Sequence, residues 1–132
     1  MQIHISRVPE FEVTDVKEIA RKIVHFQPTI DQHFPAQDRV NNDFCRSNAG
    51  DQQEIQNAQN LNQLIEIMSP SRRFAWNLQA LKQHGTIEYR QAPGQMTPRG
   101  ANSWVRFAIS FIHAVSMGYF NISNNQRQPQ RG

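Results

Sequence analysis

Glu88 and Arg90 are the residues whose types and spacing most directly suggest chemistry. They stand two positions apart in the segment Thr86-Ile87-Glu88-Tyr89-Arg90, where polar and apolar residues alternate. Alternation of this kind predicts a strand, which would place Glu88 and Arg90 on one face, roughly 6.5–7 Å apart. An acid and a guanidinium on one face can bind a charged substrate. They can equally form an ion pair on a solvated surface, where such a pair contributes little stability.

Two further segments alternate in the same way and predict partner strands for the sheet. Residues 73–78 would place Arg73 and Asn77 on the polar side, and residues 2–6 would place His4 there. The short link of residues 79–85 predicts an antiparallel hairpin between residues 73–78 and 86–90. The three strands together predict a polar patch above an apolar underside, made of His4, Arg73, Asn77, Glu88 and Arg90.

The elements that must position this patch are three amphipathic helices, near residues 14–27, 58–68 and 98–117. Their apolar residues recur at helical spacing, with Thr14 as the expected cap of the first helix. Pro28 should end that helix at about Gln27, and Pro98 and Gly118 should start and stop the last one. The polar segment of residues 38–49 predicts a surface or site loop, and the segment before Ala58 should be loose.

These elements predict an α+β fold, a small antiparallel sheet with the helices packed on one face. Residues 1–118 would form one domain. Residues 119–132 contain almost nothing apolar and should be a disordered polar tail.

Composition excludes several classes of function. The formal charge is +3, but the basic residues are scattered, so we expect no nucleic-acid partner. Cys45 is the single cysteine, which excludes an intrachain disulfide and a cysteine zinc site. No signal peptide and no apolar run of membrane-spanning length is visible, so we expect a cytoplasmic protein without a membrane partner.

Three pieces of the chain, in order, resemble the amidoligase family, whose fungal members have similar sequences. The first is Ile3-His4-Ile5-Ser6, which resembles the end of a Gly-x-His-Val-His strand. The second comprises Arg39-Val40-Asn41-Asn42 and Arg46-Ser47-Asn48, which resemble an Arg-x-Asn and Arg-Ser-Asn loop. The third is the pair of segments 73–78 and 84–91, which resemble an Asn-Leu strand and a Thr-Ile-Glu-Phe-Arg strand. The similarity covers roughly residues 1–117.

The resemblance implies a relationship to glutamine-synthetase-like carboxylate–amine ligases, with ATP and magnesium as cofactors and a small carboxylate and an amine as substrates. Such enzymes activate the acid as an acyl phosphate. Glu88 would then bind a metal or the amine, Arg90 a phosphate or carboxylate, and His4 a phosphate or substrate group. By the same resemblance, substrate or phosphate binding falls to Arg46, Asn77 and Arg73.

The departures from the family pattern open a second interpretation. A strand of the Gly-x-Glu-x-Glu type, which supplies metal-binding acids in relatives, is not seen, and Gln2 replaces the first histidine of the His-x-His pair. The chain therefore resembles an incomplete glutamine-synthetase-like domain, truncated or completed by a partner chain. The alternative is a non-catalytic accessory protein of a fungal secondary-metabolite pathway. His4 would then be an exposed strand histidine, and Arg46 and Asn48 would form loop hydrogen bonds.

Overall fold

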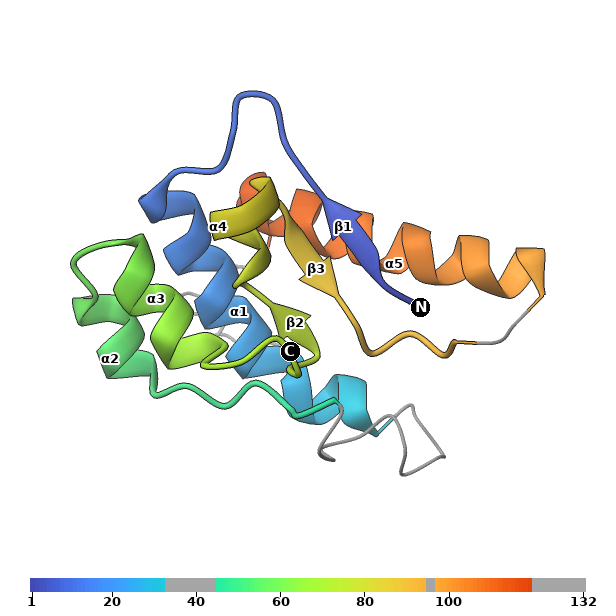
Figure 1. Cartoon of the computed structure of the whole chain (residues 1–132), viewed down its shortest axis with the longest axis horizontal. Helices are drawn as coiled ribbons and strands as arrows, with labels where there is room; N and C mark the ends of the chain where they lie inside the picture. The colour runs from blue at the N-terminus through green and yellow to red at the C-terminus, as the bar shows by residue number, and fades with distance from the viewer. Residues whose placement is uncertain (33–44, 95–96, 120–132) are drawn as a thin grey trace, which may run out of the picture.

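The computed structural model describes residues 1–32, 45–94 and 97–119, and it confirms the α+β class (Figure 1). Within these ranges, eight elements follow one another along the chain. They are β1 (Ile3–Ile5), α1 (Val13–Asp31), α2 (Gln52–Asn57), α3 (Leu61–Met68), β2 (Trp76–Asn77), α4 (Ala80–His84), β3 (Ile87–Tyr89) and α5 (Pro98–Ser116).

The sheet has the order β1-β3-β2, and both pairings are antiparallel. Glu88 on the central strand stands opposite His4 of β1 and opposite Asn77 of β2. Since directly opposed residues point to the same side of a sheet, these three polar side chains form one row across it. The three predicted strands are therefore present, although each is shorter than predicted.

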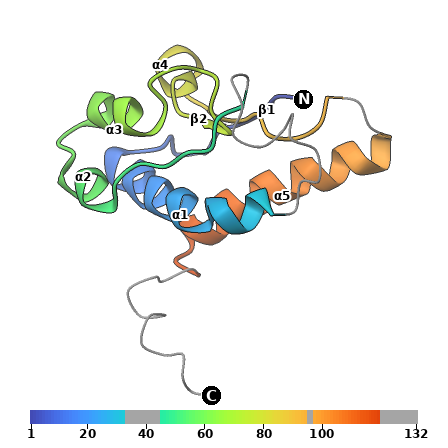
Figure 2. The ribbon, with the colours of Figure 1, turned by 90° about the horizontal axis from the view of Figure 1, so that it is seen from below.

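Helices α1 and α5 cover the apolar side of the sheet, as the turned view in Figure 2 shows. Trp76 lies at the centre of this interface, fully buried, with its ring 4.5 Å from that of Tyr89 and 5.2 Å from that of Phe111. Helices α2 and α3 pack against α1 beside the sheet. The other side of the sheet carries the polar row, so the predicted two-sided arrangement is correct.

Helix α1 corrects two predictions. It starts at Val13, with Glu12 rather than Thr14 as the N-cap, and it continues through Pro28 to Asp31. Tertiary contacts at its last turn explain the extension: Asp31 accepts hydrogen bonds from Gln91 (2.8 Å) and Ser47 (2.7 Å). Bonds between elements hold the final turn in place although proline removes one bond within the helix.

The region before Ala58, predicted to be loose, contains helix α2. Asp51 caps it by accepting hydrogen bonds from the backbone N–H groups of Gln53 (2.8 Å) and Glu54 (3.0 Å). The helix predicted over 58–68 starts at Leu61, where the Asn60 side chain accepts from Gln63 N–H. Both caps are short polar side chains in a stretch rich in glutamine and asparagine. Because many residues of this stretch are polar, the two capping residues could not be recognised among them.

The predicted hairpin link contains the short helix α4, which ends at Gly85. Gly85 adopts the left-handed conformation, with a φ of 71°, that glycine adopts at little cost. Helix α5 matches its prediction closely, with Pro98 in its first turn and Gly118 in the left-handed region just after it. The predicted disordered tail falls almost entirely on residues 120–132, outside the described residues. None of the helices in the described ranges combines the length and apolar character that crossing a membrane requires.

Asp15 provides a test of how α1 is anchored to the start of the chain. Its carboxylate accepts from Arg7 (2.6 Å) and from the Glu12 backbone N–H (2.9 Å), and the hydrogen bond from Arg7 holds the pKa of Asp15 below its ordinary value. We expect Asp15→Asn to lower the free energy of unfolding by about 1 kcal/mol at pH 7. Because the pKa is lowered in the folded state, this stabilisation is fully present above about pH 4 and is lost as the pH falls through the folded value.

Urea unfolding at pH 7 and at pH 3 measures this effect. Glu10→Gln is the matched control, because it makes the same charge change at an exposed side chain nearby. If Asp15→Asn lowers the free energy of unfolding as much at pH 3 as at pH 7, the charge of Asp15 is not the cause of the lost stability.

Candidate functional site

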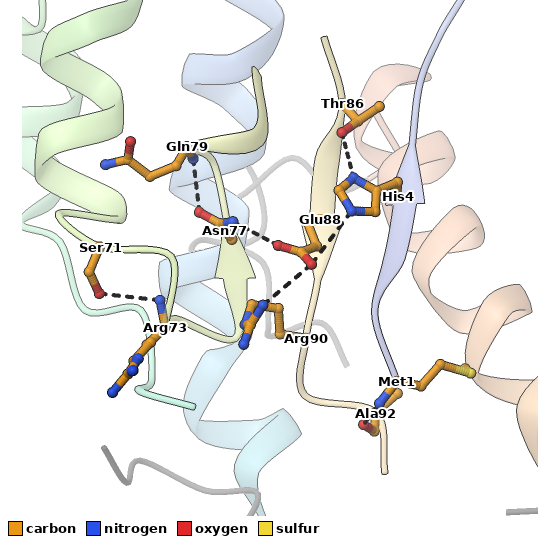
Figure 3. Close-up of polar contacts among 10 residues, drawn as sticks. All are labelled: Met1, His4, Ser71, Arg73, Asn77, Gln79, Thr86, Glu88, Arg90 and Ala92. Carbon is orange, nitrogen blue, oxygen red and sulfur yellow. Dashed lines mark hydrogen bonds and ion pairs between the residues drawn. The ribbon is translucent and has the colours of Figure 1, made fainter. Parts of the chain in front are cut away.

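Glu88 is the centre of the polar row and is buried, with 3% of its surface exposed. One carboxylate oxygen accepts a hydrogen bond from the Asn77 side-chain amide at 2.7 Å. The other lies 3.4 Å from Arg90 Nη1 and 3.5 Å from His4 Nε2 (Figure 3). The structure therefore brings three predicted site residues, His4, Asn77 and Arg90, around the carboxylate of a fourth, Glu88.

Asn77 is held in the orientation that serves Glu88. Its side-chain oxygen accepts from the backbone N–H of Gln79 at 3.0 Å, so its amide nitrogen is directed to the carboxylate (Figure 3). The Gln79 side chain in turn donates to the backbone oxygen of Ser69 at 2.7 Å. The turn after β2 thus fixes the donor that faces Glu88.

His4 forms the edge of the row that is open to solvent, with 38% of its side chain exposed. Its Nδ1 lies 2.7 Å from the Thr86 hydroxyl, and its Nε2 faces Glu88. A proton on Nε2 satisfies the carboxylate, and Nδ1 can then accept from the hydroxyl. The His4 ring also meets the His84 ring edge-on, with centroids 5.6 Å apart.

Gln2 is a site residue that the sequence prediction missed. When its amide is oriented to suit both neighbours, it donates to the Glu88 carboxylate and accepts from Arg90 Nη1, each at 2.9 Å. Gln2 therefore bridges the acid and the guanidinium. Strand alternation places residue 2 on the same face as His4, so a signal for this position was present in the sequence.

The row forms the floor of an open pocket of about 430 Å³. Helix α4 provides one wall through Gln83 and His84, and the loop after α3 provides another through Pro70, Ser71 and Arg72. These wall residues were not predicted, because neither the helix inside the hairpin link nor the path of the loop could be inferred from strand alternation.

Arg46 and Arg73 lie outside this cluster. Both side chains are exposed, and neither lines the pocket. Just before β2, the chain still contacts the end of β3 through a hydrogen bond from Arg90 N–H to Ala75 O at 2.7 Å. On its other side it pairs with Arg46, whose N–H donates to Arg73 O and whose backbone oxygen accepts from Ala75 N–H, each at 2.7 Å. The alternation of β2 therefore does not extend back to Arg73, whose side chain points away from Glu88 (Figure 3).

Asn48 supports the floor from below, as a buried side chain with 2% of its surface exposed. Its amide nitrogen donates to the backbone oxygens of Met68 (2.9 Å) and Trp76 (3.0 Å), and its oxygen accepts from Trp76 N–H (2.9 Å). These bonds connect strand β2, which is only two residues long, to the loop after residue 44. Loop hydrogen bonding, one of the two interpretations of Asn48, is thus its observed role.

The described residues do not fit a magnesium site of their own. No group of three or more histidine, cysteine, aspartate or glutamate side chains suited to a metal occurs in the ranges described. Glu88 is the one acid among the pocket-lining residues, and both of its oxygens already face the donors of the row. Magnesium is usually held by one or two carboxylates together with waters and substrate phosphates. The surroundings of Glu88 are those of an anion that orients nearby donors.

A comparison with protein families identifies the family of the chain. The family model described as "Putative amidoligase enzyme" matches residues 1–112, a range that contains the whole sheet and every pocket-lining residue named above. Searches of characterised proteins and of solved structures found no match. Since the family model matches most of the 132 residues, the chain belongs to the amidoligase family.

Proposed function

We propose that this protein takes part in ATP-dependent formation of an amide bond between a carboxylate and an amine. The observation that carries this proposal is the buried Glu88 held among Asn77, Arg90 and His4 on the floor of an open pocket. In a chain of the amidoligase family, this pocket offers charged and hydrogen-bonding groups to charged substrates. The relationship to glutamine-synthetase-like ligases is part of the same proposal.

The proposed reaction has two steps. The carboxylate of the acid attacks the terminal phosphorus of ATP, which releases ADP and forms an acyl phosphate. The amine nitrogen then attacks the acyl carbon, the phosphate leaves with the electrons of the broken bond, and the nitrogen loses a proton. The pocket's contribution is positioning together with charge stabilisation.

Arg90 and Glu88 have complementary roles in this scheme. Arg90 is held in place by Glu88 and Gln2, so its guanidinium can face a carboxylate or phosphate without first being ordered. His4 presents an imidazole at the open edge of the row, where it can contact a phosphate or substrate group. Glu88 orients these donors, and its negative charge also suits an incoming ammonium group.

Binding without catalysis is the second candidate function, and one observation favours it. The described lining of the pocket offers a single carboxylate, whereas the family resemblance implies a further strand with metal-binding acids. Any further acid would have to come from outside the described lining of the pocket. An accessory protein, in a biosynthetic pathway for example, would use the same pocket to hold a ligand for another enzyme.

Equilibrium binding of ATP tests the first candidate. We expect calorimetric titration with ATP to show saturable binding, and we expect it to weaken about tenfold or more in Arg90→Gln because a charged contact to the phosphates is lost. Arg99→Gln is the matched control, since it removes the same charge from an exposed position at the start of α5. A folded wild-type chain that shows no ATP binding would reject the ligase function and leave the accessory role.

A further inference from the structure

The wall of the pocket contains an exposed arginine that has no role in the row itself. Arg72 lies in the loop between α3 and β2, and it lines the pocket together with Gln83 and His84 of α4. Its side chain is exposed, and no acid lies among the described lining residues except Glu88. Arg72 was not among the predicted site residues.

The charges of the floor are largely balanced among themselves. Arg90 and Glu88 face each other at 3.4 Å, and only 18% and 4% of their side chains are exposed. A guanidinium and a carboxylate at this distance largely cancel at longer range. Arg72 is exposed on the wall and is not paired with Glu88, so it adds positive charge to the described lining beyond that of Arg90.

The neighbours of Arg72 on the described pocket wall are hydrogen-bonding groups, and none of them is a carboxylate that would repel an anion. Gln83 contributes an amide and His84 contributes an imidazole, whereas the amide nitrogen of Gln79 is already bonded to Ser69 O. A surface that combines one guanidinium with amide and imidazole groups is suited to oxygen anions, because guanidinium groups bind carboxylates and phosphates with two parallel hydrogen bonds.

We propose that Arg72 is the centre of a second oxyanion subsite, so that the pocket takes a ligand with two anionic groups. One group would lie against Arg90 on the floor and the other against Arg72 on the wall. The shared chemistry is that of a dicarboxylate or of linked phosphoryl groups, and a volume of about 430 Å³ accommodates either. This inference rests on the proposed function only for which ligand the pocket takes in the reaction. The subsite itself is tested by the binding of small anions, which requires no turnover.

Two pairs of small anions, each with a one-group and a two-group member, test the subsite. Calorimetric titrations compare glutarate with acetate and pyrophosphate with phosphate, at one ionic strength and without nucleotide. We expect the ligand with two anionic groups to bind about threefold to tenfold more tightly in at least one pair, as an added partly exposed charge contact would provide. Whether glutarate or pyrophosphate shows the larger gain distinguishes a second carboxyl group from a phosphoryl chain.

Arg72→Gln should remove this gain and leave acetate and phosphate binding unchanged. Arg99→Gln, which changes the net charge equally at a distant exposed position, should retain it. Equal binding within both pairs, a gain that persists in Arg72→Gln, or no detectable binding of any of the four anions would each overturn the inference. Selective glutarate binding by a chain that never binds ATP would support the subsite while rejecting the ligase function.

Discussion

Replacing Glu88 with alanine is expected to lower the free energy of unfolding by about 2–4 kcal/mol. The substitution removes the acceptor that faces Asn77, Arg90, His4 and Gln2, and it leaves the largely buried guanidinium of Arg90 without its carboxylate. Burial of the carboxylate and the charged donors makes this loss larger than that of a surface ion pair. Urea unfolding followed by circular dichroism measures the difference.

Glu66→Ala is the matched control for this prediction, because Glu66 is an exposed glutamate on α3. Its effect should stay within about 0.5 kcal/mol. A double-mutant cycle isolates the Glu88–Arg90 pair: the loss in the double variant should be smaller than the sum of the single losses. If Glu88→Ala unfolds at the same urea concentration as wild type, the carboxylate does not hold the row together.

Asn48→Ala is expected to produce a loss of similar size, about 2–4 kcal/mol, by a different mechanism. The variant leaves the buried backbone N–H of Trp76 without its acceptor, and it removes two donors from the carbonyls of Met68 and Trp76. Strand β2 has only two residues, so it depends on these bonds for its position. The same urea experiment measures the effect.

Asn62→Ala provides the comparison for Asn48, since it removes an exposed asparagine from α3 and puts a better helix former in its place. We expect its unfolding midpoint to equal or exceed that of wild type. Amide hydrogen exchange adds a local measurement: in Asn48→Ala the protection of Trp76 N–H should fall more than that of residues in α5. Unchanged protection at Trp76 would contradict the supporting role of Asn48.

Strand alternation was sufficient to predict the three strands of the sheet and four residues of the site. The period of two placed His4, Asn77, Glu88 and Arg90 on one face, and antiparallel pairing then brought them into register. The same argument failed at Arg73, because the chain leaves the β2–β3 ladder before reaching it and pairs with Arg46 instead. The alternation of polar and apolar residues shows on which side of a strand a residue lies. It does not show where the hydrogen-bonded pairing of two strands ends.

Burial of the floor could not be predicted, because it depends on elements that carry no strand signal. The polar face was expected either to bind a charged substrate or to be solvated, and Glu88 proved to be buried under its own hydrogen-bonding partners and the pocket walls. The wall of α4 lies in a link that resembles an ordinary hairpin loop, and Arg72 lies in a loop without periodicity. Pro28 shows the same limit in α1, where tertiary bonds to Asp31 outweigh a local helix-ending signal.

ADP formation tests the central claim most directly, which is that the polar row is the site of an ATP-dependent ligase. The assay supplies ATP, magnesium and the twenty amino acids, each of which carries both a carboxylate and an amine, and it compares wild type with Glu88→Gln and Glu66→Gln. The account predicts ADP formation that requires the amino acids, falls about a hundredfold or more in Glu88→Gln, and is unchanged in Glu66→Gln. ADP formation at the wild-type rate in folded Glu88→Gln would contradict it.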